Sequence, residues 1–235
     1  DLKSKISSKT KFIIINSPNN PTGRVMSKEE LLQIADLARE NPNINILSDE
    51  IYELILKKEF KHYSLSSLAN DLKDRIFIIN GFAKGWAMTG WRIGYLVGPK
   101  DVIKASSALQ SQSTSNVCSF VQKGALEALK INNEFFSMIN SHYDQRRSLL
   151  YEGLKNINGI YIEEPNGAFY AFPKLPNSSI TSVDFCNKAL QDYGLVVVPG
   201  KAFGDDQCIR ISCATSLDHV KDGLSRLQTA ISAYY

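Results

Sequence analysis

Short apolar runs alternate with turn-forming and helical segments over the first hundred residues. The apolar runs that we expect to form strands are Lys11–Asn16, Ile44–Leu47, Ile76–Ile79 and Arg92–Gly98. A helix is expected to begin at Ser27, because Glu30 follows three residues later and completes a capping box. Strand, helix and strand joined by short connections are typical of a doubly wound α/β layer with a mostly parallel sheet.

After Pro99 the pattern changes to two long helical stretches, expected over residues 100–129 and 133–154. Shorter elements follow, with strands expected near 159–163, 167–172, 195–198 and 208–212, and helices near 183–192 and 216–233. This mixture predicts a smaller α+β domain. We therefore expect an α/β domain over residues 1–110, a long-helix linker over 111–140 and the α+β domain over 141–235.

Composition and charge exclude several classes of function. A net charge of +3 on 235 residues, with the basic residues scattered, does not favour nucleic-acid binding. The histidines at 62, 142 and 219 lack ligand spacing, so we expect no metal site. No apolar run is long enough for a membrane span, and the N-terminus lacks a signal-peptide core. Four cysteines without CxxC spacing favour free thiols in a reducing, cytoplasmic compartment.

Polar side chains follow the expected strands at their carboxyl ends, where ligands bind in open α/β sheets. Asn20 follows the first strand, Asp49 and Tyr52 the second, and Lys84 the third, while Arg92 opens the fourth. Taken singly, each has a structural explanation as a turn residue, a helix cap or a surface charge. Turn propensity does not predict the whole set. A lysine held at the end of a buried strand suits imine formation with a carbonyl cofactor.

The order and spacing of several motifs extend this pattern over essentially the whole chain. They are Asn20–Gly23, Ser48–Tyr52, Asn80–Lys84, Ala87–Tyr95, Pro165–Tyr170, Val197–Gly204 and Ile209–Ser212. With these motifs the sequence resembles the class I/II aminotransferases of fold type I, which use pyridoxal 5′-phosphate. It is most similar to the bacterial-type aspartate and aromatic subgroup. The resemblance implies part of the large cofactor-binding α/β domain, followed by the small α+β domain.

The resemblance also implies roles at the cofactor. Lys84 matches the lysine that forms the internal aldimine, and Asp49 matches the acid that faces the pyridine nitrogen and keeps it protonated. Tyr52 and Asn20 match the groups that hydrogen-bond the phenolic oxygen of the cofactor. Arg92 matches the arginine that binds the phosphate.

On the substrate side, Arg210 matches the arginine that receives the α-carboxylate, a role suited to its planar, bidentate fork. The implied reaction is transamination between an amino acid, either aspartate/glutamate or aromatic, and a 2-oxo acid, with Lys84 moving the proton. The resemblance further implies a homodimer. We expect the polar segment 111–116, with Ser113 and Asn116, to lie near the neighbouring subunit's cofactor. An exposed break in the helix is an equally open explanation of this polar segment.

Two departures from the family pattern affect these expectations. Gly81 stands where some relatives carry a phosphate-binding serine. Roughly 150 residues normally precede the segment that begins at Asn16, judged by usual domain sizes. We therefore expect a C-terminal portion that exposes a strand edge and an apolar face, holds no firmly bound cofactor and is inactive by itself.

Two alternatives remain open at this stage. Another fold type I activity, such as a carbon–sulfur lyase or a kynurenine-type transaminase, would share Lys84, Asp49 and Arg210. A transcription regulator with an aminotransferase-like effector domain would differ upstream, where a helix-turn-helix pattern would replace a glycine-rich phosphate cradle.

Overall fold

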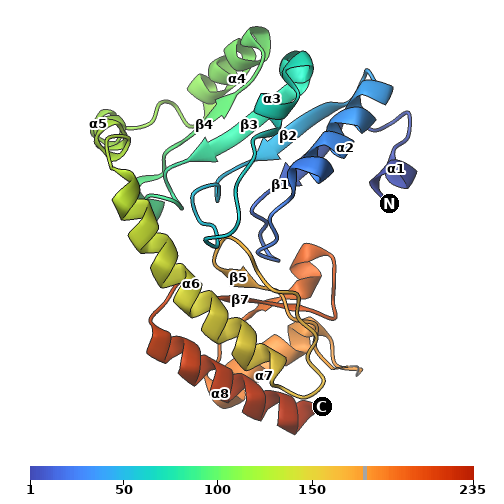
Figure 1. Ribbon diagram of the computed structural model, residues 1–235, viewed down its shortest axis with the longest axis vertical. Helices are drawn as coiled ribbons and strands as arrows, with labels where there is room; N and C mark the ends of the chain where they lie inside the picture. The colour runs from blue at the N-terminus through green and yellow to red at the C-terminus, as the bar shows by residue number, and fades with distance from the viewer. Residues whose placement is uncertain (177–178) are drawn as a thin grey trace. The chain divides into compact units, whose positions relative to one another are not determined.

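The computed structural model describes residues 1–176 and 179–235 and divides the chain into two compact units. Unit 1 comprises residues 1–18, 26–54 and 61–136, and unit 2 comprises residues 19–25, 55–60 and 137–235 (Figure 1). The domain boundaries expected from the sequence, near residues 110 and 140, stay a prediction.

Unit 1 is built on a four-stranded sheet in the order β1-β2-β3-β4. Its strands are β1 Phe12–Asn16, β2 Asn45–Asp49, β3 Ile76–Gly81 and β4 Gly94–Val97. The first three are parallel and β4 is antiparallel to β3. All four expected strands are present, although β4 begins two residues later than predicted. Arg92 does not open it, because this residue adopts a left-handed conformation (φ 53°) that interrupts extended backbone.

One face of this sheet is covered by helices α2 (Lys28–Glu40) and α3 (Leu65–Leu68) (Figure 1). The capping box at the start of α2 is confirmed, since Ser27 and Glu30 each bond the backbone N–H of the other. The apolar stripe of α2 packs on inward-facing strand residues. This core contains Ile13, Ile15, Leu31, Ile34, Ala35, Ala38, Ile44, Ile46, Leu65, Ala69, Leu72 and Ile76.

The other face of β1 carries apolar side chains that remain exposed. Phe12 is 48% exposed and Ile14 is 70% exposed, while the alternate residues Ile13 and Ile15 are buried. Within the described residues, β1 pairs only with β2, and β4 only with β3. Apolar residues on both faces are typical of strands in parallel α/β sheets, and the expected strand edge and apolar face are thus present in unit 1.

The helical part of unit 1 corrects one expectation. The continuous helix predicted over 100–129 is two helices, α4 (Lys100–Ser113) and α5 (Ser119–Ala128). The break is exposed and includes Ser115 with a positive φ of 60°. Serine, threonine and asparagine compete with helical hydrogen bonds, so this polar segment ends the helix. Short helical pieces complete the unit: α1 (Leu2–Lys5), η1 (Asn70–Arg75) and η2 (Thr89–Trp91).

The long helix α6 (Asn133–Lys155), found where it was predicted, leads into unit 2. Unit 2 has a small antiparallel sheet in the order β5-β7-β6, formed by β5 (Tyr170–Ala171), β6 (Val198–Pro199) and β7 (Ile209–Ser212). Helices α7 (Ser182–Tyr193) and α8 (Leu217–Tyr234) and the 3₁₀ turn η3 (Gly200–Phe203) complete it.

Helices α6 and α8 approach each other closely (Figure 1). Gly153 permits this approach, because an added Cβ there would lie 2.4 Å from the Leu224 side chain. The strand predicted at 159–163 is reduced to a single bridge between Tyr161 and Lys174. Among the helices of the described residues, none combines the length and apolarity that crossing a bilayer would require.

Candidate functional site

The carboxyl end of β2 presents Asp49 and, three residues later, Tyr52. Asp49 is the last residue of the strand, and its carbonyl accepts hydrogen bonds from the Asn16 side chain (3.1 Å) and the Ser17 backbone N–H (3.3 Å). Its carboxylate accepts the Ile51 N–H at 3.2 Å. Burial raises the pKa of Asp49 above its ordinary value, and the neighbouring carboxylate of Glu50 raises it further, against the Ile51 hydrogen bond.

Lys84 lies in the loop that follows β3, the strand next to β2. Its Nζ is 5.7 Å from the ring centroid of Tyr52, whose side chain is buried. Acid, phenol and amine thus come from two adjacent parallel strand ends, as the sequence predicts. This is the edge of an α/β sheet where bound ligands are found.

Arg92 lies two residues before the start of β4 and is exposed. Its guanidinium donates to the Thr89 carbonyl at 3.0 Å. The strand that follows pairs with β3 through facing glycines, Gly81 and Gly94, and a Cβ at Gly81 would lie 2.7 Å from the Gly94 Cα. Glycine at position 81 therefore permits close backbone approach at this strand end.

Unit 2 brings Asn20 and Arg210 together although they are 190 residues apart in the chain. The Arg210 guanidinium donates to the Asn20 side-chain oxygen at 2.9 Å. Its central carbon is 4.7 Å from the ring centroid of Tyr170 and 5.0 Å from that of Phe203. Tyr170 and Phe203 belong to the motifs Pro165–Tyr170 and Val197–Gly204. Their positions in the sequence did not predict that they contact Arg210. Cation–π contacts hold the guanidinium plane.

A buried carboxylate network beside Asp49 was missed from the sequence. Glu50 is only 3% exposed, and its Oε1 accepts hydrogen bonds from the hydroxyls of Ser48 and Ser64, both at 2.9 Å. Its Oε2 lies 3.2 Å from the His62 Nε2. Glu50, His62 and Glu53 each offer one atom that could bind a metal ion, and these three atoms lie within 4.8 Å of one another. The protein contacts of Glu50 account for its burial without an ion, and the expected absence of a metal site stays a prediction.

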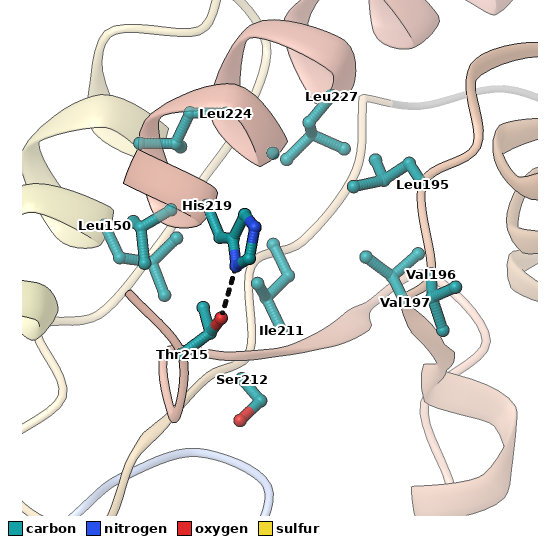
Figure 2. A pocket seen from close by; sticks show the side chains of 12 residues that line it. Leu150, Leu195, Val196, Val197, Ile211, Ser212, Thr215, His219, Leu224 and Leu227 are labelled. Atoms are coloured by element: carbon teal, nitrogen blue, oxygen red, sulfur yellow. Dashed lines mark hydrogen bonds between the residues drawn. The ribbon is translucent and has the colours of Figure 1, made fainter. Parts of the chain in front are cut away.

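A separate apolar cavity of about 190 Å³ lies in unit 2 (Figure 2). Leucine and valine side chains from α6, α8 and the segment before β6 line most of it, and His219 contacts the Thr215 hydroxyl at 3.0 Å. None of the sequence-predicted site residues lines this cavity. The predicted chemistry therefore does not depend on it.

Comparison with known proteins agrees with this arrangement. Residues 1–227 match the family model described as "Aminotransferase class I and II". A probable aspartate/prephenate aminotransferase of Rickettsia felis is 41% identical over 97% of this chain and 58% of its own length. An aspartate aminotransferase of Pyrococcus horikoshii is 40% identical over 98% of this chain and 59% of its own length. The chain thus spans less than two thirds of these relatives.

Solved structures show the same fold. An aromatic aminotransferase from Pyrococcus horikoshii superposes with a TM-score of 0.92 and 34% identity, covering 99% of this chain and 62% of that one. An aspartate aminotransferase of Thermus thermophilus with maleate gives 0.89 and 38%, covering 97% and 59%. The expected fold class, a partial fold type I transferase, is confirmed. The chain belongs to the class I and II aminotransferases, a family that uses pyridoxal 5′-phosphate.

Proposed function

We propose that the protein is a pyridoxal-phosphate-dependent aminotransferase that exchanges an amino group between an amino acid and a 2-oxo acid. The observation that carries the proposal is the placement of Lys84 against Tyr52 at the strand ends where Asp49 also lies, in a chain of this family. Another activity of the same fold type would use these residues too. Transamination is favoured because the relatives above are named for it.

The chemistry of the unit 1 side chains fits the cofactor. Asp49 is a half-buried carboxylate whose pKa is raised by burial, and among the described residues it forms no ion pair. Such a group is stabilised in its ionised form by a cation placed against it, and a protonated pyridine nitrogen is that cation. Lys84 supplies the amine, Tyr52 a phenol and Arg92 a guanidinium for the phosphate. When bound, the cofactor supplies an electron sink for the carbanion formed at the substrate Cα.

Lys84 has two tasks in this proposal. It first holds the cofactor through its amine, and after displacement by the substrate it moves the proton at the Cα as general base and acid. The buried Tyr52 ring lies beside this amine. We assign its hydroxyl, together with the amide of Asn20, to the phenolic oxygen of the cofactor.

Arg210 is proposed to bind the substrate α-carboxylate. One N–H group donates to Asn20, and the central carbon of the guanidinium lies 4.7 Å from the Tyr170 ring centroid and 5.0 Å from that of Phe203, so contacts within the unit hold the arginine before a ligand arrives. An ordered guanidinium can donate hydrogen bonds to both oxygens of a carboxylate at a small entropic cost.

Aspartate is the proposed amino donor, because the curated relatives cited above carry that substrate in their names. Prephenate, named for the Rickettsia relative, is a candidate 2-oxo acid acceptor. Nucleic acid and membrane play no part in the proposal. A cytoplasmic location is proposed because the four cysteines are free, and burial raises the pKa of Cys186 and Cys208 to about 12. Such thiols suit a reducing compartment.

Replacement of Lys84 tests the central assignment. In the full-length protein, Lys84→Ala should abolish transamination and should prevent covalent retention of pyridoxal phosphate at this position after borohydride reduction, because no amine remains at the site. Peptide mass spectrometry measures the retention at residue 84. Lys104→Ala, which removes an exposed lysine of α4, should leave both properties unchanged. Full activity in the Lys84 variant would refute the proposed role.

Asp49 should make the unliganded protein less stable at neutral pH. Its folded-state pKa is raised above the unfolded value, so its contribution to stability is fully present below the unfolded pKa and is lost as the pH rises through the folded pKa. Asp49→Asn avoids this loss. Urea unfolding should show the variant gaining stability relative to the parent between about pH 3 and pH 7. If the difference in free energy of unfolding between variant and parent were the same at about pH 3 and pH 7, the buried-charge explanation would be wrong.

In the full-length protein, Arg210→Lys should weaken substrate binding while the cofactor stays bound. Losing one charge-assisted bidentate contact costs about 1.5–3 kcal/mol, so the KM for amino and oxo acids should rise by roughly tenfold or more. Steady-state kinetics with aspartate measures this change, and equilibrium dialysis follows the cofactor. If the KM for the carboxylate substrates were unaltered, Arg210 would have no part in binding them.

The proposed assembly is a homodimer, in which the exposed segment with Ser113 and Asn116 lies near the neighbouring subunit's cofactor. Sedimentation equilibrium should then report twice the 26.2 kDa of the chain. A monomer across the micromolar range would argue against this assembly, without bearing on the chemistry of Lys84.

A further inference from the structure

The turn that carries Tyr52 is joined to the strand that leads to Lys84 by one short hydrogen bond. The Asn80 amide donates to the Glu53 carboxylate at 2.6 Å. Asn80 is only 4% exposed, and its own side-chain oxygen accepts the Gly81 N–H at 2.7 Å. A hydrogen bond to a carboxylate is about twice as strong as one between neutral groups. The end of β3 is therefore tied to the 50–54 turn.

A second contact joins the same two segments beyond Lys84. A Cβ built on Gly85 would lie 2.8 Å from the Leu54 Cδ1 and 2.9 Å from its Cβ. Leu54 thus occupies the space that a side chain at position 85 would need. Asn80 precedes Lys84 at the end of β3, and Gly85 follows Lys84 directly. The two contacts with the 50–54 turn therefore lie on either side of Lys84 in the chain.

Glu50 anchors the other side of the turn. Its carboxylate is held by Ser48, Ser64 and His62, while its backbone N–H donates to the Ile79 carbonyl of β3 at 2.9 Å. The two glutamates thus fix opposite sides of the short segment that carries Tyr52. Of the two, only the Glu53 side chain bonds the strand that delivers Lys84.

We infer that Glu53, acting with Asn80, is a positioning residue that holds the Tyr52 ring beside the Lys84 amine. The inference rests on the proposed function, because the 5.7 Å separation between Lys84 Nζ and the centroid of the Tyr52 ring matters only if both residues act on the cofactor. Glu53 itself touches no reacting atom in this assignment. Its effect passes through the turn to Tyr52 and through Asn80 to the loop of Lys84.

Reductive trapping of pyridoxal phosphate tests this inference without measuring activity. The full-length protein is incubated with the aldehyde and reduced with borohydride, and the labelled fractions at Lys84 and at the exposed Lys104 are counted by peptide mass spectrometry. The Lys84/Lys104 ratio reports how well the site presents Lys84, and the surface lysine corrects for reagent and time. Thermal melting in parallel shows that each variant is folded.

Glu53→Ala should lower the ratio about tenfold, the change that loss of a charge-assisted hydrogen bond produces. Glu53→Gln keeps an oxygen for the Asn80 amide and should retain most of the parent ratio. Glu164→Ala is the matched control, because it removes a carboxylate contact of the same 2.6 Å length, to Lys57 in unit 2. This control should leave the ratio unchanged.

A steric pair of variants covers the case in which Glu53→Ala does not fold. Gly85→Ala should lower the ratio by pushing on Leu54. Gly85→Ala combined with Leu54→Gly should restore it, because this second change removes both the Cδ1 and the Cβ that the new methyl group would meet. Restoration by a second truncation is not expected of a general loss of stability.

The outcomes separate the two levels of the argument. A parent chain without preference for Lys84 over Lys104 would overturn the proposed function of Lys84 and this inference with it. A clear preference that persists in folded Glu53→Ala, or in Gly85→Ala if the former is unfolded, would overturn the positioning role alone. A ratio lowered in Glu53→Ala and kept in Glu53→Gln supports it.

Discussion

The parallel pairing of β1, β2 and β3 is the constraint on which the unit 1 chemistry depends. Its register sets Asn16 opposite Asp49 and Asp49 opposite Ile79, so the three strands end at one edge of the sheet. A shift of one residue would turn every side chain of a strand to the other face. The buried isoleucines on one face of these strands prevent such a shift, because it would expose the core against α2. Apolar packing therefore fixes where the polar groups emerge.

The polar groups at this edge differ in how well they are satisfied. Glu50, Ser48 and Asn80 are buried, and each has a hydrogen-bond partner, as buried polar groups require. Asp49 is different, since burial raises its pKa and no cation of the described chain pairs with it. Carboxylates with a raised pKa are common at functional sites. This difference supports the proposal that Asp49 faces the cofactor while the hydrogen-bonded network beside it forms the support.

Local sequence signals predicted the elements of unit 1 better than its contacts. Apolar runs located every strand, and the Ser27–Glu30 spacing located the start of α2, because both are properties of neighbouring residues. The break after α4 was only an alternative to one continuous helix, because the helical periodicity on either side does not show that the polar stretch between them stays exposed. The Glu53–Asn80 bond joins residues 27 positions apart, and no spacing rule anticipates it. Asn20 and Arg210 were selected as functional residues, with the arginine identified by family resemblance, yet only folding shows that they bond each other.

The two units divide the proposed chemistry by the type of interaction each can provide. Unit 1 offers an amine, an acid and a phenol at the end of a rigid sheet, where small displacements change reactivity. Unit 2 offers an arginine in contact with two rings, and its proposed task is to recognise a carboxylate with a planar guanidinium. Because Asn20, Tyr170 and Phe203 belong to the same unit as Arg210, the orientation of the guanidinium is set by local packing. The orientation of Arg210 and the arrangement of Lys84 beside Tyr52 are therefore each set by contacts within one unit.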